Sequence, residues 1–585
     1  VSALIASTTN AATIKSSQNK RCFCLPGQPC WPAPSDWSAL NDAVGGRLIV
    51  TTPVARECHD PNYDKARCDD IQAGYFNATW RQNQPGAVVH TNWETFKGQG
   101  CLGFDRSLPC LQGAVSLYTV EALSAADVQA TVRFAAKHKI RLVVKNTGHC
   151  YLGRSSAANS INLWVHHMNK IDVVDSYIAE GAPAGTAGIP AVIMEGGVLL
   201  GDMYKAVHDH GRVAVGGAYR SVSAVGGYCQ GGGHSPISRY FGLCVDNVLQ
   251  YKVVTADGEL RVANAYQNQD LFWALRGGGG GTFGVVVEGV VRTHPEFQSI
   301  QRVLVIITAT DEAVMQQVVS SFYAENGRLA NDGWSGYTFV ERHTLSINYF
   351  VPNATVEQAK DSLRPFLDHV LSLQGIAIVT EKYESFSSFY EFQPRCEELL
   401  TVGGTTGYIG GRLIPQEFFQ TPAEAGRLAT TMRDLQLDIE SFNPNGTYVA
   451  MLVGGGEVAK AKAEETSVTP AWRKALMLLV PFVSWTDNTP YKAQLQAQGM
   501  MTKANGRLIK LIPDGGAYIN EADPNEPNWG QSFFGDNYAR LRSIKQQYDP
   551  TGVFVCRRCV GSEDWDSDLM CHSPPSTKRQ RHIVL

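Results

Sequence analysis

Residues 145–151 read Lys145-Asn146-Thr147-Gly148-His149-Cys150-Tyr151, and this short polar stretch decides how the chain is interpreted. It directly follows the apolar run 141–144, which predicts a buried β-strand. Upstream, Ser124 and Asp127 form a capping pattern that predicts a helix over 124–138. Asn, Thr and Gly tolerate turn conformations and can present backbone N–H groups to an anion. The stretch therefore predicts an anion-binding loop with a histidine at its tip, the alternative being a histidine that only closes a turn.

Three further blocks occur downstream, in this order: 226–234 (Gly-Gly-Tyr-Cys-Gln-Gly-Gly-Gly-His), 270–281 (Asp-Leu-Phe-Trp-Ala-Leu-Arg and five glycines) and 534–538 (Phe-Gly-Asp-Asn-Tyr). Together with residues 122–167 they resemble the vanillyl-alcohol-oxidase superfamily of PCMH-type FAD-linked oxidoreductases, in its berberine-bridge-enzyme-like branch and in a form similar to secreted fungal members. The resemblance extends from about Trp31 to Val560. It implies an α+β fold with a PCMH-type FAD-binding domain and a substrate domain whose antiparallel sheet is flanked by helices.

The resemblance implies that His149 carries FAD through a covalent bond to the 8α-methyl carbon of the flavin. Doubly attached members add a cysteine bond from a position six residues before the paired glycines, where this chain has Arg220. A guanidinium cannot form a thioether, so we expect one covalent bond, with Cys229 as the alternative second partner. The other residues expected to bind FAD are Lys145, Asn146, Thr147, Gly148, Cys150, Tyr151, Ser155, Gly226, Gly227, Gly232, Gly233, Gly284, Val285 and Asn537.

The glycine run 277–281 invites comparison with a Rossmann dinucleotide loop, but the order of elements is wrong for one. A Rossmann loop follows a strand and opens a helix, whereas this run follows the helix-like stretch 270–276 and precedes a strand expected at 283–290. We therefore expect no nicotinamide site. The resemblance implies that these glycines approach the ADP part of FAD.

Tyr518 and Asn520 belong to a Tyr-x-Asn segment that matches the family, and we expect them to be catalytic, the alternative being an ordinary aromatic in a strand. Glu464 and Glu465 lie where relatives often place a carboxylate base. The leading hypothesis is a secreted oxidase that converts an alcohol, which is a small alcohol, a secondary metabolite or a sugar, and O2 to a carbonyl and H2O2. A dehydrogenase, an oxidative cyclase of secondary metabolites and a flavin-containing binding protein without turnover are the alternatives.

Composition narrows the class of partner. The 585 residues carry a formal charge of only −4 without a long basic stripe, which argues against nucleic acid. The sequence has no apolar run of eighteen residues, so we expect no membrane span. A monomer acting on a small molecule, without a metal, is expected.

Cysteines indicate the compartment. Of the 14, seven lie between Cys22 and Cys110 and three between Cys556 and Cys571, as in disulfide-bonded extracellular proteins. A zinc site at the C-x-x-C of 556–559 is the alternative. Sequons at Asn77, Asn353 and Asn445, and a start at Val1 that suits a processed signal peptide, add to the expectation of secretion.

Changes of pattern divide the chain into five parts. We expect a disulfide-rich lead-in (1–113), an FAD-binding domain with alternating helices and strands (114–295), and an α+β substrate domain (296–483). A C-terminal return to the FAD domain (484–560) and a partly mobile tail (561–585) complete the chain.

Overall fold

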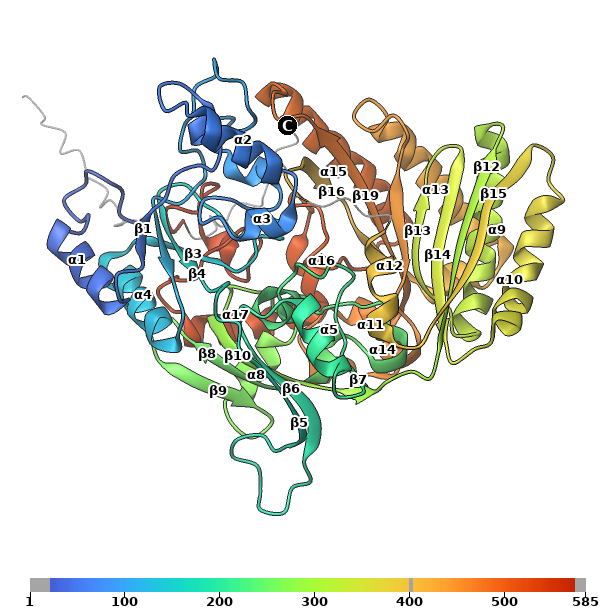
Figure 1. The fold of residues 1–585 in the computed structure, drawn as a ribbon, viewed down its shortest axis with the longest axis horizontal. Helices are drawn as coiled ribbons and strands as arrows, with labels where there is room; N and C mark the ends of the chain where they lie inside the picture. The colour runs from blue at the N-terminus through green and yellow to red at the C-terminus, as the bar shows by residue number, and fades with distance from the viewer. Residues whose placement is uncertain (1–20, 399–402, 574–585) are drawn as a thin grey trace, which may run out of the picture.

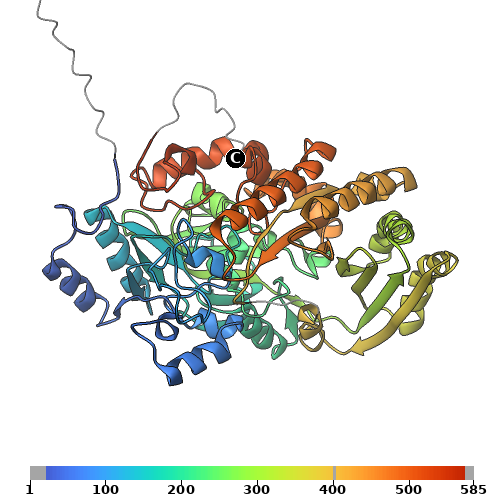
Figure 2. The ribbon, with the colours of Figure 1, turned by 90° about the horizontal axis from the view of Figure 1, so that it is seen from above.

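The computed structural model describes residues 21–398 and 403–573, in which two units lie side by side (Figures 1 and 2). The first unit contains a four-stranded sheet in the order β1 (Leu48–Val50), β2 (Tyr118–Glu121), β4 (Ser160–Trp164) and β3 (Arg141–Lys145). Helix α4 (Ala125–His138) begins as the sequence predicts, because Ser124 Oγ accepts a hydrogen bond from the Asp127 N–H. Val128, Val132 and Ala135 then face the core beneath the sheet.

A second sheet of the first unit is antiparallel, in the order β5 (Ile171–Tyr177), β6 (Ile189–Glu195), β10 (Val285–Arg292), β8 (Val248–Val254) and β9 (Leu260–Asn264). A hairpin whose turn contains Asp257 and Gly258 joins β8 to β9. Its core also receives α5 (Leu200–His208) and α8 (Gln269–Leu275). The remaining small elements of this unit are β7 (Arg212–Val213), β11 (His294–Pro295), α6 (Ser238–Phe241), α7 (Cys244–Asn247) and the π-helical turn η3 (Ala224–Tyr228).

The second unit is built on an eight-stranded antiparallel sheet, as the α+β expectation requires. Its strands are β15 (Ile376–Phe386), β12 (Ile300–Ala309), β14 (Thr344–Pro352), β13 (Ser335–Val340), β18 (Tyr448–Leu452), β19 (Ala475–Trp485), β16 (Thr406–Ile409) and β17 (Arg412–Pro415). Four helices form a core with one face of the sheet: α9 (Glu312–Asn331), α10 (Val356–Leu371), α13 (Pro422–Ile439) and α15 (Tyr491–Leu511). This core continues through α15, past the boundary expected near Val483.

The chain then returns to the first unit through α16 (Trp529–Phe534) and α17 (Tyr538–Tyr548). Short helices occupy the connections: α11 (Phe389–Phe392), α12 (Pro394–Glu397) and α14 (Gly456–Lys460). None of the helices in the described ranges is long and apolar enough to cross a bilayer.

The two ends of the described chain are more ordered than the sequence suggests. In the lead-in, α1 (Pro34–Ala43) packs on α4, while α2 (Lys65–Gly74) and α3 (Ala78–Gln82) follow. In the expected tail, residues 561–573 are tied down because a disulfide joins Cys22 to Cys571 and Phe23 donates its N–H to Met570 O. The expectation of a mobile tail is wrong for these residues, and 574–585 lie outside the described ones.

Candidate cofactor-binding and active site

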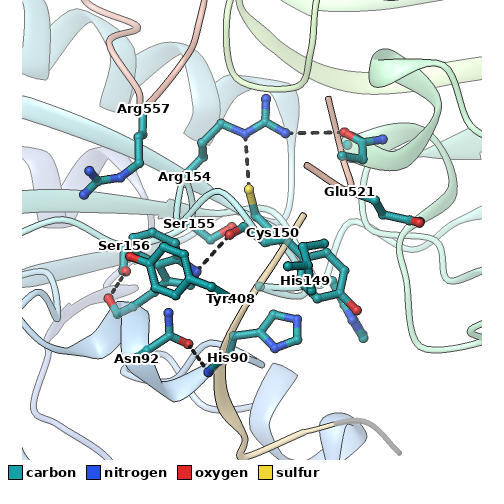
Figure 3. Close-up of a pocket in the computed structure, with 18 of the residues that line it drawn as sticks. His90, Asn92, His149, Cys150, Arg154, Ser155, Ser156, Tyr408, Glu521 and Arg557 are labelled. Atoms are coloured by element: carbon teal, nitrogen blue, oxygen red, sulfur yellow. Dashed lines mark hydrogen bonds between the residues drawn. The ribbon is translucent and has the colours of Figure 1, made fainter. Parts of the chain in front are cut away.

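A cavity of about 910 Å³ lies between the two units, and Figure 3 shows part of its lining. Its size falls within the range of cofactor and small-molecule sites. The loop after β3 contributes six consecutive residues, 146 to 151, to the lining. Ser155, Gly226, Gly227, Tyr518 and Asn520 also line the cavity, so segments far apart in sequence meet there.

Six residues expected at the site do not line the cavity. Lys145 is buried behind the loop, where its Nζ donates to Gln84 O at 2.6 Å and lies over the Trp164 ring. Burial lowers the pKa of Lys145 to about 7. The others contact neighbouring parts of the chain: Gly232 and Gly233 lie against Tyr518, Gly284 and Val285 pack on β8, and Asn537 Nδ2 donates to Val468 O.

The loop is held from behind by a buried ion pair. Arg81 Nη2 bonds Glu94 Oε1, which also accepts the Val88 N–H at 2.8 Å. The next residue, Val89, donates its N–H to Gly148 O at 3.0 Å. Gly148 has φ +87° and its missing Cβ would lie 3.1 Å from Val88 Cα, so only glycine fits this close approach. The lead-in segment thus fixes the backbone directly before His149.

His149 lies in the cavity wall as a neutral imidazole. Its Nε2 is 2.9 Å from Ser221 Oγ, and its ring stacks near Tyr219 with centroids 6.2 Å apart. Burial and the charge of nearby His90 lower the pKa of His149 to about 3. When Nε2 donates its proton to Ser221, Nδ1 keeps a free lone pair and can act as a nucleophile.

The lining contains buried polar atoms without hydrogen-bond partners, as expected for a site that binds a large polar cofactor. Asn146 Oδ1, Arg154 Nη1, His90 Nε2 and Asn92 Nδ2 have no hydrogen-bond partner among the described residues. Leaving such groups unpaired is costly, so a ligand that bonds them gains affinity. At Gly227 a Cβ would meet nothing within 4 Å, because this glycine opens onto the cavity. The residues present therefore fit FAD.

Basic side chains gather along part of the cavity. Arg141, Arg154 and Arg557 line it together with Lys97, whose Nζ pairs with Asp568 at 2.8 Å. Arg557 lies over the Trp93 ring at 5.0 Å, and Arg154 Nε donates to Cys150 Sγ at 3.1 Å. Guanidinium groups are suited to phosphate oxygens, so this part of the lining fits a pyrophosphate.

The second unit supplies an apolar wall. Alternate residues of β13, β18 and β19 point to the cavity: Tyr337, Phe339, Val449, Met451, Val480 and Phe482. Their neighbours along the strands, such as Ala450, Leu452 and Leu479, pack on the helices instead. Tyr408 and Ile409 of β16 extend the wall. None of these eight side chains is charged. The second unit also contributes polar lining residues: Glu341, Thr406, Thr447, Ser484, Gln494 and Gln498.

Tyr518 and Asn520 are hydrogen-bonded to each other in the cavity lining. The Tyr518 hydroxyl oxygen accepts hydrogen bonds from Gly233 N–H at 3.1 Å and from Asn520 Nδ2 at 2.8 Å. Asn520 Oδ1 accepts from Arg154 Nη2 at 3.4 Å. Burial raises the pKa of Tyr518 far above its usual value, so this phenol stays protonated.

Glu464 and Glu465, expected near the base, are not in the cavity. Both side chains are exposed, and that of Glu465 lies 3.6 Å from Lys462 Nζ. Their backbone carbonyls accept hydrogen bonds from Trp273 Nε1 and Arg276 Nη2. The carboxylate beside Tyr518 is Glu521, whose Oε1 lies 3.0 Å from His234 Nε2.

The cysteine considered as a second attachment point for the flavin is engaged in a disulfide. Cys229 is joined to Cys244 by a disulfide. Arg220 is about half exposed, and its side chain lies 3.7 Å from Glu397. The Cys556–Cys559 pair, considered as a zinc motif, also forms a disulfide.

Several lining residues escaped the sequence analysis. His90, Asn92 and Trp93 come from the lead-in, and the apolar wall comes from strands that carry no motif. Glu521, which lines the cavity, and Ser221, which bonds His149 without lining it, each directly follow a residue that the motifs pointed to.

Comparison with known proteins identifies the family. The family models described as "FAD binding domain" and "Berberine and berberine like" match residues 116–264 and 517–560. An uncharacterized FAD-linked oxidoreductase of Arthroderma benhamiae is 37% identical over 96% of this chain and 97% of its own length. The chain belongs to the vanillyl-alcohol-oxidase superfamily, in its berberine-bridge-enzyme-like branch. It is an FAD-linked oxidoreductase.

Solved structures of the superfamily share the architecture. The VAO-type flavoprotein MtVAO615 of Myceliophthora thermophila C1 superposes with a TM-score of 0.86 at 32% identity, covering 94% of this chain and all of that one. A glucooligosaccharide oxidase of Acremonium strictum, described as carrying 6-S-cysteinyl, 8α-N1-histidyl FAD, gives a TM-score of 0.59 at 20% identity. It covers 92% of that chain and 76% of this one, and shows a likeness of fold alone.

Proposed function

We propose that this oxidoreductase holds FAD covalently through His149 alone and oxidises an alcohol to a carbonyl with O2 as acceptor, releasing H2O2. The observation that carries the proposal is the place of His149. It lies in the cavity, its low pKa keeps it neutral, and Ser221 occupies one ring nitrogen so that the other is free. The Acremonium oxidase has the same histidyl linkage by description, which supports the proposal.

The chain's own groups would hold the cofactor as follows. Asn146 and Arg154 offer the unpartnered polar atoms, and Arg141 and Arg557 offer charge for the phosphates. Gly226 packs tightly against Asn146, because a Cβ there would come within 2.2 Å of Asn146 Nδ2, and Gly227 leaves space on the side of the cavity, because a Cβ there meets nothing within 4 Å. When bound, the flavin supplies the acceptor for the two electrons of the substrate.

A single attachment follows from the cysteines. Cys229 is engaged in its disulfide, and Arg220 stands where doubly attached relatives have cysteine. Cys150 is free, but it neighbours His149 in the loop and its sulfur accepts a hydrogen bond from Arg154. We therefore propose that this chain lacks the cysteinyl bond described for the Acremonium enzyme.

An alcohol suits the remaining surfaces. The apolar wall of β13, β18 and β19 would hold the body of a small alcohol or secondary metabolite, whereas Thr447, Ser484 and Gln494 beside it offer hydrogen bonds to the hydroxyls of a sugar. Tyr518 stays protonated and, with Asn520, is placed to orient the substrate oxygen by hydrogen bonding. Both remain our proposed catalytic residues.

Secretion is part of the proposal. Six disulfides join twelve cysteines of the described residues, which suits an oxidising compartment. The side chains of Asn77, Asn353 and Asn445 are all exposed and accessible to glycosylation. We propose a monomeric extracellular enzyme.

Replacing His149 by Ala tests the attachment. Wild-type protein precipitated with acid should keep its yellow colour, whereas H149A should release all of its flavin to the supernatant. Colour that washes off wild-type protein would contradict the covalent bond. Photoreduced wild-type enzyme should reoxidise quickly in air; slow reoxidation would instead favour the dehydrogenase or cyclase alternative. A failure of every alcohol to reduce the flavin would favour the binding protein.

A further inference from the structure

Three carboxylates line the cavity: Glu341, Glu521 and Asp568. Asp568 is ion-paired with Lys97 beside the basic side chains. Glu341 directly follows β13. It is four residues beyond Tyr337, so the backbones of these two residues are roughly 13 Å apart along the extended chain. Glu521 lies on the first-unit side of the cavity: it directly follows Asn520, which bonds Tyr518, and its Oε1 is 3.0 Å from His234 Nε2.

The Glu521 side chain is placed for proton transfer. It is 21% exposed, and it directly follows Asn520, which bonds Tyr518. Its Oε1 is bonded to Nε2 of His234, a side chain only 6% exposed. Its Oε2 is buried without a partner in the described part of the chain, so this carboxylate retains capacity to accept a hydrogen bond.

The tyrosines around Glu521 cannot serve as the base at ordinary pH. Burial, reinforced by the charge of Glu521, raises the pKa of Tyr151, Tyr219, Tyr337 and Tyr518. They remain hydrogen-bond donors. The eight side chains of the apolar wall include no carboxylate, and Glu521 is the cavity carboxylate that lies beside Tyr518 and Asn520.

We propose that Glu521, oriented by His234, is the base that accepts the hydroxyl proton of the alcohol. The inference rests on the proposed function. The O–H bond breaks and its proton passes to the carboxylate, while the hydride leaves the carbinol carbon with two electrons for the flavin and a C=O bond forms. The alcohol is oxidised, the flavin is reduced, and O2 takes up the two electrons and two protons as H2O2.

Glu521→Gln tests the base, with Glu121→Gln as the matched control. Glu121 also pairs with a histidine, His167, at 2.7 Å, and is 29% exposed, but it lies outside the cavity. The probes are cinnamyl alcohol, benzyl alcohol, 1-hexanol and cellobiose, mixed without oxygen while flavin absorbance is followed. With the alcohol that reduces wild type fastest, E521Q should be reduced about 100- to 10,000-fold more slowly and E121Q at the wild-type rate. Dithionite should reduce all three proteins alike.

Binding gives a readout without turnover. Cinnamate carries a carboxylate in place of the hydroxyl of cinnamyl alcohol, so Glu521 should repel it. Titration followed by the flavin absorbance change should show cinnamate binding about tenfold tighter to E521Q than to wild type or E121Q, because the like charge is gone. Equal cinnamate affinities for E521Q and wild type would place Glu521 away from the substrate carboxylate and overturn the proposal.

His234 acts through Glu521 and is a positioning residue. His234→Gln keeps a donor that can reach the carboxylate, whereas His234→Leu removes it. H234L should lower the limiting rate of flavin reduction about tenfold while leaving the concentration for half-saturation nearly unchanged, and H234Q should recover most of the rate. Equal losses in the two variants would mean that His234 only fills space.

The outcomes separate the two proposals. Wild type reduced by none of the probes contradicts the proposed function and the base with it. Wild type and E521Q reduced equally fast, with H149A still releasing its flavin, contradicts the base alone.

Discussion

At the scale of single residues, the bond between His149 and Ser221 decides which ring nitrogen is free. Ser221→Ala removes that bond, so the imidazole loses both its orientation and its preferred tautomer. A lost hydrogen bond of about 1 kcal/mol predicts attachment roughly fivefold slower. Adding FAD to cofactor-free protein and measuring the acid-stable fraction over time checks this. A wild-type rate in S221A would show that Ser221 does not hold the ring.

Asp523 illustrates how burial makes stability depend on pH. Burial raises its pKa to about 7, and its Oδ2 has no partner in the described ranges. Above pH 7 the folded protein carries a buried charge; as pH falls from about 7 towards 4, the folded chain takes up a proton before the unfolded chain does and gains stability. Asp523→Asn should therefore raise the free energy of unfolding of the protein by about 1–3 kcal/mol at pH 8 and by less at pH 5. Melting curves at both pH values check this, and an equal gain at both would contradict the assignment.

Sequence predicted single residues well where a motif fixed the backbone and poorly where contacts cross the fold. The loop from Asn146 to Tyr151 lines the cavity as expected, because a turn after a strand is a local property. Gly284 and Asn537 do not line the cavity: Gly284 lies against β8 and Asn537 Nδ2 donates to Val468 O, so their role in binding FAD stays a prediction. Glu521 became visible only through its contact with His234.

At the scale of elements, the π-helical turn η3 presents Gly227 to the cavity. Gly227→Ala adds a methyl group where the protein itself leaves space, so we expect flavin content to fall at least severalfold while the fold survives. Gly506→Ala in α15 is the control, because a Cβ there also meets nothing within 4 Å and it lies outside the cavity. Alanine within a helix should stabilise that variant by about 1 kcal/mol. Flavin absorbance per protein measures the flavin content of both variants. Full flavin content in G227A would show that Gly227 does not contact the flavin.

The same scale shows why the fold could be anticipated. The cap and the apolar face of helix α4 can be recognised from residues that are close together in the sequence. Strands β12 and β14 coincide with stretches of the sequence that are rich in β-forming residues. The wall of the cavity could not be anticipated, because Tyr337 and Met451 become neighbours only through pairing of β13 with β18.

At the scale of the whole molecule, the Cys22–Cys571 disulfide closes the chain around the cavity. It spans 549 residues, and the segment Ser567–Leu569 beside it lines the cavity. Replacing both cysteines by Ser should lower the free energy of unfolding by roughly 4–6 kcal/mol. Removing the Cys24–Cys30 disulfide, which spans only six residues, should lower it by about 2 kcal/mol. Thermal melting of the two double variants tests this. An equal loss would show that chain closure is not what the long-range disulfide contributes.

The central claim, that His149 alone carries the flavin, is tested most directly by fragmenting flavin-bearing peptides in a mass spectrometer. Trypsin should release Asn146–Arg154 with its FAD, since Lys145 and Arg154 bound that peptide. We expect fragments that place the added mass on His149, with Cys150 and the peptide containing Cys229 unmodified. Flavin found on either cysteine, or on no peptide at all, would contradict it.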